Sequence, residues 1–117
     1  MRSHQVVIVD DDDLALGTLH RLIAHWGYDV VPFMTFEEAR SFLATNTPDA
    51  LVVDVRLGSY NGLQLVHLAK QAAPTMTVVA VSGFDDAVLR AEAEKAGATY
   101  LVKPVDITRL RQYLPQP

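Results

Sequence analysis

The stretch VVIVDDDD, residues 6–13, joins four β-branched residues directly to four aspartates. A short apolar run of this kind predicts a strand buried on both faces. The adjoining carboxylates repel one another, so their clustering requires a structural or chemical reason. Asp10 and Asp11 end the predicted strand, whereas Asp12 and Asp13 stand where the next helix should begin. We expect Asp13 to be the N-cap of that helix.

Strand-like and helix-like segments alternate along the chain. The predicted strands are 6–9, 29–33, 50–55, 77–81 and 99–102. Apolar residues at helical spacing predict helices over 14–26, 35–45, 61–73, from a cap at Asp85 or Asp86 to Ala96, and from a cap at Asp106 to about Leu114. This alternation predicts an α/β fold, with a parallel sheet covered on both faces. For five strands with right-handed crossovers it favours the doubly wound order 2-1-3-4-5.

The composition narrows the class of protein. The 117 residues fit a single domain, placed at residues 1–117, and half of them are hydrophobic, enough for one core. A net charge of −4 disfavours direct binding of nucleic acid. The absence of cysteine excludes thiolate metal sites and cysteine nucleophiles. No stretch approaches the roughly 18 apolar residues of a membrane span, so we expect a cytoplasmic domain without membrane contact.

Polar residues end four of the predicted strands. Asp10 and Asp11 end the first strand and Asp54 ends the third, and the doubly wound order places these two ends side by side. Ser82 and Lys103 end the fourth and fifth strands at the same edge. Three clustered carboxylates need a cation, and their oxygens suit Mg²⁺. A carboxylate with Mg²⁺, a lysine and a hydroxyl is typical of a phosphoryl-transfer site that forms an aspartyl phosphate.

With these motifs in place, the chain resembles the receiver domain of two-component response regulators, including the chemotaxis regulators. The resemblance rests on VVIVDDDD, LVVDVRLGSYNG, VVAVSGF and YLVKPV, which occur in this order and cover nearly the whole chain. It implies a flavodoxin-like (βα)5 fold. The sequence departs from the family pattern at Gly58, where proline is usual, and we expect a more mobile loop there.

The resemblance implies a role for each acidic residue at the predicted sheet edge. Asp54 would be the phosphoacceptor. Asp11 and Asp54 would bind Mg²⁺ directly, and Asp10 would bind it through water. The backbone carbonyl of Arg56 would be a further metal ligand.

The resemblance also implies a switch. Lys103 and Ser82 would contact the phosphoryl group, and the Lys103–Pro104 peptide bond would be cis. Movement of Ser82 would let Tyr100 turn inward. The readout surface would comprise the fourth helix, the fifth strand and the last helix, and it would act on an unidentified effector.

A sensor histidine kinase or a histidine phosphotransfer protein would supply the phosphoryl group. The domain would catalyse its own phosphorylation and later hydrolysis, so it would be a signalling domain more than a turnover enzyme.

Two alternative functions are compatible with the same residues. One is a degenerate receiver that acts only as a protein-interaction module. The other is an aspartate-nucleophile phosphatase of the haloacid-dehalogenase type, because Asp10 and Asp12 form a D-x-D motif after the first strand. A flavodoxin-like binder is disfavoured, since an acidic loop repels a phosphate.

Overall fold

A computed structural model of the chain describes residues 4–116, so the predicted domain limits at residues 1 and 117 lie outside the described residues. One sheet contains five parallel strands in the order β2-β1-β3-β6-β7. These strands are β1 (Gln5–Val9), β2 (Asp29–Phe33), β3 (Ala50–Asp54), β6 (Thr77–Ser82) and β7 (Thr99–Val102). The predicted α/β fold with the order 2-1-3-4-5 is therefore confirmed.

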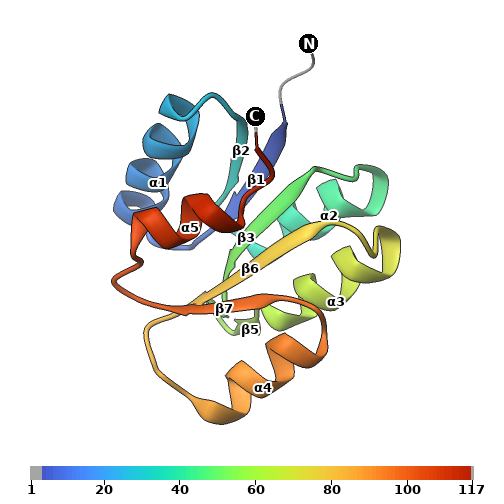
Figure 1. The fold of residues 1–117 in the computed structure, drawn as a ribbon. Coiled ribbons are helices and arrows are strands. Elements are labelled where there is room, and N and C mark those ends of the chain that lie inside the picture. The colour runs from blue at the N-terminus through green and yellow to red at the C-terminus, as the bar shows by residue number, and fades with distance from the viewer. Residues whose placement is uncertain (1–3, 117) are drawn as a thin grey trace.

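Helices cover both faces of this sheet (Figure 1). They are α1 (Asp13–His25), α2 (Phe36–Thr45), α3 (Leu63–Ala72), α4 (Ala87–Lys95) and α5 (Ile107–Tyr113). Helices α1 and α5 pack on one face, while α2, α3 and α4 pack on the other. The sheet is thus the middle layer of three.

Alternating side chains of β1 supply both halves of the core. Val7 and Val9 pack in the cluster that contains residues of α2, α3 and α4, whereas Val6 and Ile8 pack with α1 and α5. Successive strand residues point to opposite faces, so an unbroken apolar run suits a strand that is covered on both sides. All of β3 is likewise buried, including Asp54 at its end. The strands that carry the acidic residues therefore have little freedom to shift.

The N-cap of α1 differs from the prediction. Asp12 has extended backbone angles, and its side chain accepts hydrogen bonds from the N–H groups of Leu14 at 3.1 Å and Ala15 at 3.4 Å. The prediction of Asp13 as the cap is wrong, because α1 begins one residue earlier than expected and Asp13 lies in its first turn. Asp106 is the cap of α5 as predicted, and of the two candidates for α4 the cap is Asp86, while Thr35 caps α2.

A short hairpin, absent from the sequence-based expectations, follows β3. Strand β4 (Arg56–Leu57) pairs antiparallel with β5 (Tyr60–Asn61) around a two-residue turn. The predicted helix from residue 61 accordingly starts at Leu63, since residues 60 and 61 belong to the hairpin.

Gly62 brings the chain from this hairpin back against β3. Its N–H donates to the carbonyl oxygen of Val55 at 2.6 Å. A Cβ atom at Gly62 would overlap the carbonyl oxygen of Asp54. The close backbone contact therefore requires glycine.

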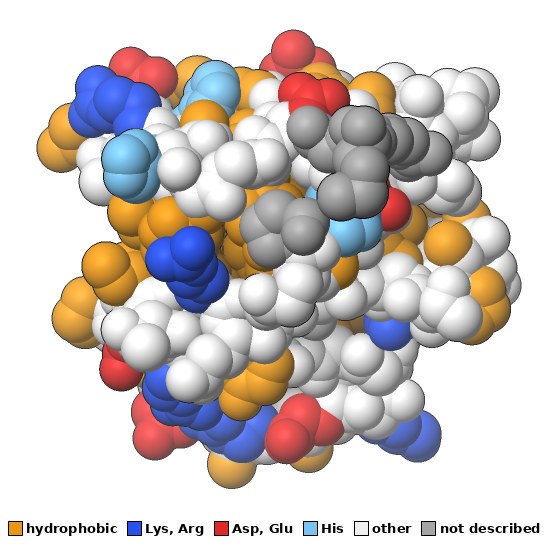
Figure 2. All heavy atoms as spheres, turned by 45° about the horizontal axis from the view of Figure 1, so that its top comes forward, with side chains coloured by type: hydrophobic (Ala, Val, Ile, Leu, Met, Phe, Trp, Pro, Cys, Tyr) orange, Lys and Arg blue, Asp and Glu red, His pale blue; other side chains and the backbone are white. Residues whose placement is uncertain are grey.

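Two features of the structure concern a membrane and nucleic acid as partners. Within residues 4–116, no helix has both the length and the apolar character to cross a membrane. On the face turned forward in Figure 2, basic side chains occur in separate groups with acidic ones among them. That face does not present the continuous basic patch that nucleic acid favours.

Two glycine-to-alanine substitutions should have opposite effects on stability. Gly62→Ala should lower the free energy of unfolding by about 1–3 kcal/mol through overpacking against Asp54. Gly17→Ala should raise it by about 0.5–1 kcal/mol, because Gly17 lies inside α1 and an added Cβ would meet no atom within 4 Å. Urea unfolding measures both, and a Gly62→Ala variant as stable as the wild type would contradict the close contact.

Candidate functional site

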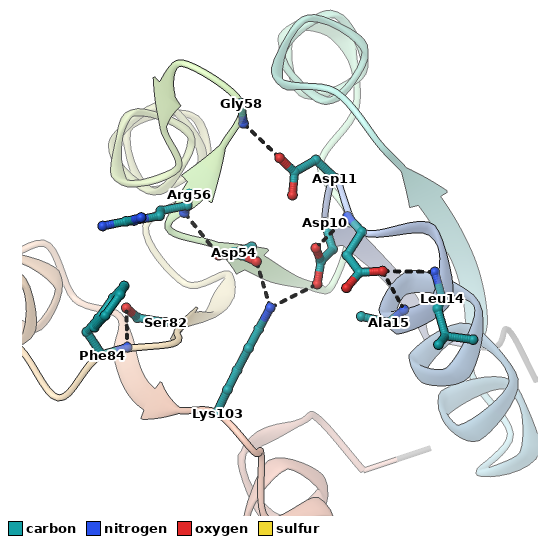
Figure 3. A network of polar contacts seen from close by, with 11 residues as sticks. Asp10, Asp11, Leu14, Ala15, Asp54, Arg56, Gly58, Ser82, Phe84 and Lys103 are labelled. Atoms are coloured by element: carbon teal, nitrogen blue, oxygen red, sulfur yellow. Dashed lines mark hydrogen bonds and ion pairs between the residues drawn. The ribbon is translucent and has the colours of Figure 1, made fainter.

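Polar side chains gather where the strands of the main sheet end (Figure 3). β1 pairs with β3 through Val9 and Val53, and Asp10 and Asp54 come next on each strand. The two carboxylates therefore lie side by side. Lys103 follows β7 and reaches past the end of β6 to contact both of them.

Lys103 connects two buried carboxylates. Its Nζ atom donates to Oδ2 of Asp54 at 2.8 Å and to Oδ2 of Asp10 at 3.3 Å. Asp54 is 8% exposed and Asp10 is 7% exposed, so water solvates neither charge well. One ammonium group thus compensates two carboxylates incompletely.

The pKa values of Asp10 and Lys103 reflect both burial and the neighbouring charges. Burial raises the pKa of the Asp10 carboxyl above its ordinary value, and the charge of Asp54 raises it further, although bonds from the Asp12 N–H and Lys103 lower it. Burial lowers the pKa of Lys103, but the hydrogen bond and charge of Asp54, together with Asp10, outweigh burial and raise it. Lys103 therefore keeps its proton, and the ionised form of Asp10 is disfavoured.

Asp11 adds a third, exposed carboxylate. One oxygen from each of Asp10, Asp11 and Asp54 lies within 4.8 Å of the other two. Oδ2 of Asp11 accepts a hydrogen bond from the N–H of Gly58 at 2.9 Å. Three carboxylate oxygens at this spacing fit a hard divalent cation such as Mg²⁺, which prefers oxygen ligands.

Arg56 contacts the site with its backbone and the adjacent loop with its side chain. Its N–H donates to Oδ1 of Asp54 at 3.0 Å, so both Asp54 oxygens have hydrogen-bond partners. Its guanidinium group lies over the ring of Phe84, 4.7 Å from the ring centre. The role of the Arg56 carbonyl as a metal ligand stays a prediction.

The two predicted switch residues meet at the backbone of Phe84. Oγ of Ser82 accepts from the Phe84 N–H at 3.2 Å, and the Tyr100 hydroxyl donates to the Phe84 carbonyl oxygen at 2.6 Å. Tyr100 is buried, and the guanidinium group of Arg90 lies over its ring, 4.8 Å from the ring centre. Among the described contacts, Ser82 is not hydrogen-bonded to Asp54. The peptide bond between Lys103 and Pro104 is cis.

Two contacts were not predicted from the sequence: the bond of Gly58, noted only as a departure from the family pattern, to Asp11, and the contact of Arg90 with Tyr100. Gly58-Ser59 is a dipeptide typical of two-residue hairpin turns, so a signal for β4 and β5 was present. The hairpin was nevertheless not predicted, because β4 and β5 have only two residues each and are too short to show the alternation of a strand. Arg90 gave no signal, because its contact with Tyr100 depends on how α4 packs against β7.

Comparison with known proteins identifies the class. Residues 6–115 match the model of the family described as the response regulator receiver domain, and the chain belongs to this family.

Two similar proteins are longer than this chain. The DNA-binding transcriptional regulator NtrC of Salmonella typhimurium is 35% identical over 108 residues, which are 92% of this chain and 23% of NtrC. The photosynthetic apparatus regulatory protein RegA of Rhodobacter capsulatus is 30% identical over 105 residues, 89% of this chain and 57% of RegA. The chain thus spans about a quarter of the length of NtrC and just over half of RegA.

Solved structures share the fold. A response regulator from Burkholderia pseudomallei, solved with a phosphorylated aspartic acid, a calcium ion and citrate, has a TM-score of 0.88 at 25% identity, covering 97% of this chain and 67% of that one. A CheY-like receiver domain protein from Methanospirillum hungatei also has a TM-score of 0.88 at 25% identity, covering 95% and 90%.

Neutralising Asp10 should stabilise the metal-free protein. The pKa of Asp10 is higher in the folded protein than its ordinary value of 3.8, so above pH 3.8 the folded protein binds more protons than the unfolded chain. The free energy of unfolding therefore falls as the pH rises through the pKa of the folded state. Asp10→Asn should therefore raise Tm at pH 7 by roughly 4 °C, the shift that about 1 kcal/mol produces in a domain of this size. The gain should shrink below pH 3.8, where Asp10 is protonated in both states.

Thermal unfolding in chelator, followed by circular dichroism from pH 3 to 8, measures this effect. Asp29→Asn, at an exposed strand residue, serves as the matched control. A lower Tm for Asp10→Asn at pH 7 would contradict the electrostatic account.

Proposed function

We propose that this receiver domain accepts a phosphoryl group on Asp54 from a phosphohistidine of a partner protein. The observation that carries the proposal is the contact of Lys103 with Asp54 and Asp10, beside a third carboxylate, at the strand ends. The phosphorylated aspartic acid in the Burkholderia pseudomallei relative supports the same chemistry. We also propose that residues 1–117 form a single receiver domain.

Asp11, Asp54, Asp10 through water, and the carbonyl of Arg56 would hold Mg²⁺. The carboxylate donors and their 4.8 Å spacing fit this ion. When bound, Mg²⁺ supplies positive charge that stabilises the oxygens of the transferring phosphoryl group.

The chain's own residues perform the transfer. A carboxylate oxygen of Asp54 forms a bond to phosphorus while the phosphorus–nitrogen bond of the donor breaks, and the electron pair stays on the imidazole nitrogen. Lys103, already 2.8 Å from Asp54, pairs with the phosphoryl oxygens as a protonated ammonium group. The Arg56 N–H orients the carboxylate by holding its other oxygen. Later attack of water on phosphorus would release phosphate and restore Asp54.

Phosphorylation would reach the output surface through Ser82. The Ser82 hydroxyl accepts from Phe84 and still has its own hydrogen to donate, so it can bond to a phosphoryl oxygen. Because the Phe84 carbonyl also binds Tyr100, movement of Ser82 would alter the contacts of Tyr100 with α4. The surface of α4, β7 and α5 would then favour a different partner.

A groove between α1 and α5 suits the phosphohistidine donor. It has a volume of about 660 Å³, and Asp54 and Lys103 line it together with apolar side chains. Leu14 is 77% exposed and Ile107 is 49% exposed on the two helices. An apolar surface continuous with the acceptor lets a donor protein dock while its imidazole reaches Asp54. We place this encounter in the cytoplasm, as is typical of the family.

Intact-mass spectrometry tests the phosphoacceptor. With acetyl phosphate and Mg²⁺, the wild type should gain one phosphoryl group, and Asp54→Asn or added chelator should abolish the gain. A gain that persists in Asp54→Asn would favour Asp10 as the nucleophile and the phosphatase alternative. A wild type that neither acetyl phosphate nor any histidine donor modifies would favour the degenerate receiver.

Leu14→Arg should separate docking from chemistry. The added charge in the apolar groove should slow transfer from a histidine phosphotransfer protein that phosphorylates the wild type, by about tenfold or more. Labelling by acetyl phosphate should not change, since Leu14 touches no reacting group. Val88→Arg, at a residue of α4 that is 75% exposed, is the matched control. Equal transfer rates for both variants would place the donor elsewhere.

A further inference from the structure

The turn of the β4–β5 hairpin presents a backbone amide to the acidic cluster. The N–H of Gly58 donates to Oδ2 of Asp11 at 2.9 Å, across 47 residues of sequence (Figure 3). Gly58 has a φ of 61°, in the left-handed region. The left-handed turn and the amide bond to Asp11 thus occur at the same residue.

Asp11 needs such a contact to stay in the cluster. It is exposed, and it lies beside the negative charges of Asp10 and Asp54. Lys103 contacts those two carboxylates, and the donor found for the Asp11 side chain within residues 4–116 is Gly58. Without the amide, repulsion would favour rotamers that turn Asp11 into solvent.

We propose that Gly58 is a positioning residue for the metal site, whose amide holds Asp11 so that one oxygen stays beside those of Asp10 and Asp54. This inference rests on the Mg²⁺ site of the proposed function. A carboxylate has two oxygens, and Gly58 occupies one of them, which leaves the second for a cation. Figure 3 shows this second oxygen on the side of Asp11 away from Gly58.

Glycine at this position has a specific physical basis. Proline has no N–H to donate, and its ring fixes φ near −65°, so it could neither make this bond nor adopt this turn. A Cβ at Gly58 would meet nothing within 4 Å, so space does not exclude a side chain, but the φ of 61° strains most residues other than glycine. The requirement is therefore the N–H in a left-handed turn, which asparagine can also supply.

The hairpin that carries the amide is anchored at several points. The ring of Tyr60 stacks on that of Phe36 in α2, with 4.5 Å between ring centres and an angle of 8° between planes. Leu57 is 2% exposed, and Gly62 is bonded to Val55. These contacts hold both ends of the hairpin, so its amide can restrict Asp11, and the mobility of the loop stays a prediction.

Two variants at position 58 test the proposal. Gly58→Pro removes the N–H and the left-handed turn, whereas Gly58→Asn retains both. Isothermal calorimetry with MgCl₂ should show binding about tenfold weaker for Gly58→Pro, the loss typical when a group that orients a metal ligand is removed. Gly58→Asn should bind within about twofold of the wild type. Far-UV circular dichroism verifies that both variants fold.

Three outcomes would overturn the role of Gly58. Gly58→Pro could bind Mg²⁺ as tightly as Gly58→Asn, it could bind more tightly because the amide competes with the ion, or both variants could lose binding equally. A wild type without Mg²⁺ binding would instead contradict the metal site of the proposed function.

Amide hydrogen exchange in the wild type provides a test that does not require the proline variant to fold. The Gly58 amide should exchange several-fold more slowly in the wild type than in Asp11→Ala, without metal. Equal exchange in the two proteins would show that the amide does not hold Asp11, and it would overturn the proposal.

Discussion

One ammonium group, Nζ of Lys103, lies between two buried carboxylates that the sheet forces together. Asp10 and Asp54 follow paired residues of adjacent strands, so neither can withdraw without breaking the register of β1 and β3. The charge of Lys103 cannot balance both, and burial together with the charge of Asp54 raises the pKa of Asp10. The backbone amides of Asp12, Arg56 and Gly58 also donate to carboxylates of this cluster, and the remaining negative charge favours a cation.

The hydrophobic layers make this unfavourable arrangement persist. β1 and β3 are covered on both faces, and shifting either strand by one residue would move its apolar side chains to the wrong layer. The core therefore stabilises a cluster that its own electrostatics disfavour. Stored unfavourable charge of this kind is typical of functional sites, where the cost is offset by the rest of the fold.

Much of this arrangement follows from sequence, because the strand ends of a parallel sheet meet at one edge. Knowing the strand order was enough to bring Asp10, Asp54 and Lys103 together. The N-cap of α1 was predicted at Asp13 but is Asp12, since α1 starts one residue earlier than its apolar pattern indicates. The hairpin of β4 and β5 was not predicted, because strands of two residues show no hydrophobic periodicity. The contact of Arg90 with Tyr100 depends on helix packing, which local sequence does not encode.

Phe84 links the acceptor to the distant helices with three independent contacts. Its ring lies under the guanidinium group of Arg56, its N–H bonds to Ser82, and its carbonyl accepts from Tyr100. Arg56 is itself bonded to Asp54, and Tyr100 lies under Arg90 of α4. One chain of contacts thus runs from Asp54 through Arg56 and Phe84 to Tyr100 and Arg90 of α4, whereas Ser82 contacts Phe84 and, among the described contacts, has no hydrogen bond to Asp54. Under the proposed function, a phosphoryl group on Asp54 that bonds to Ser82 would add a second chain of contacts to α4 through the same loop.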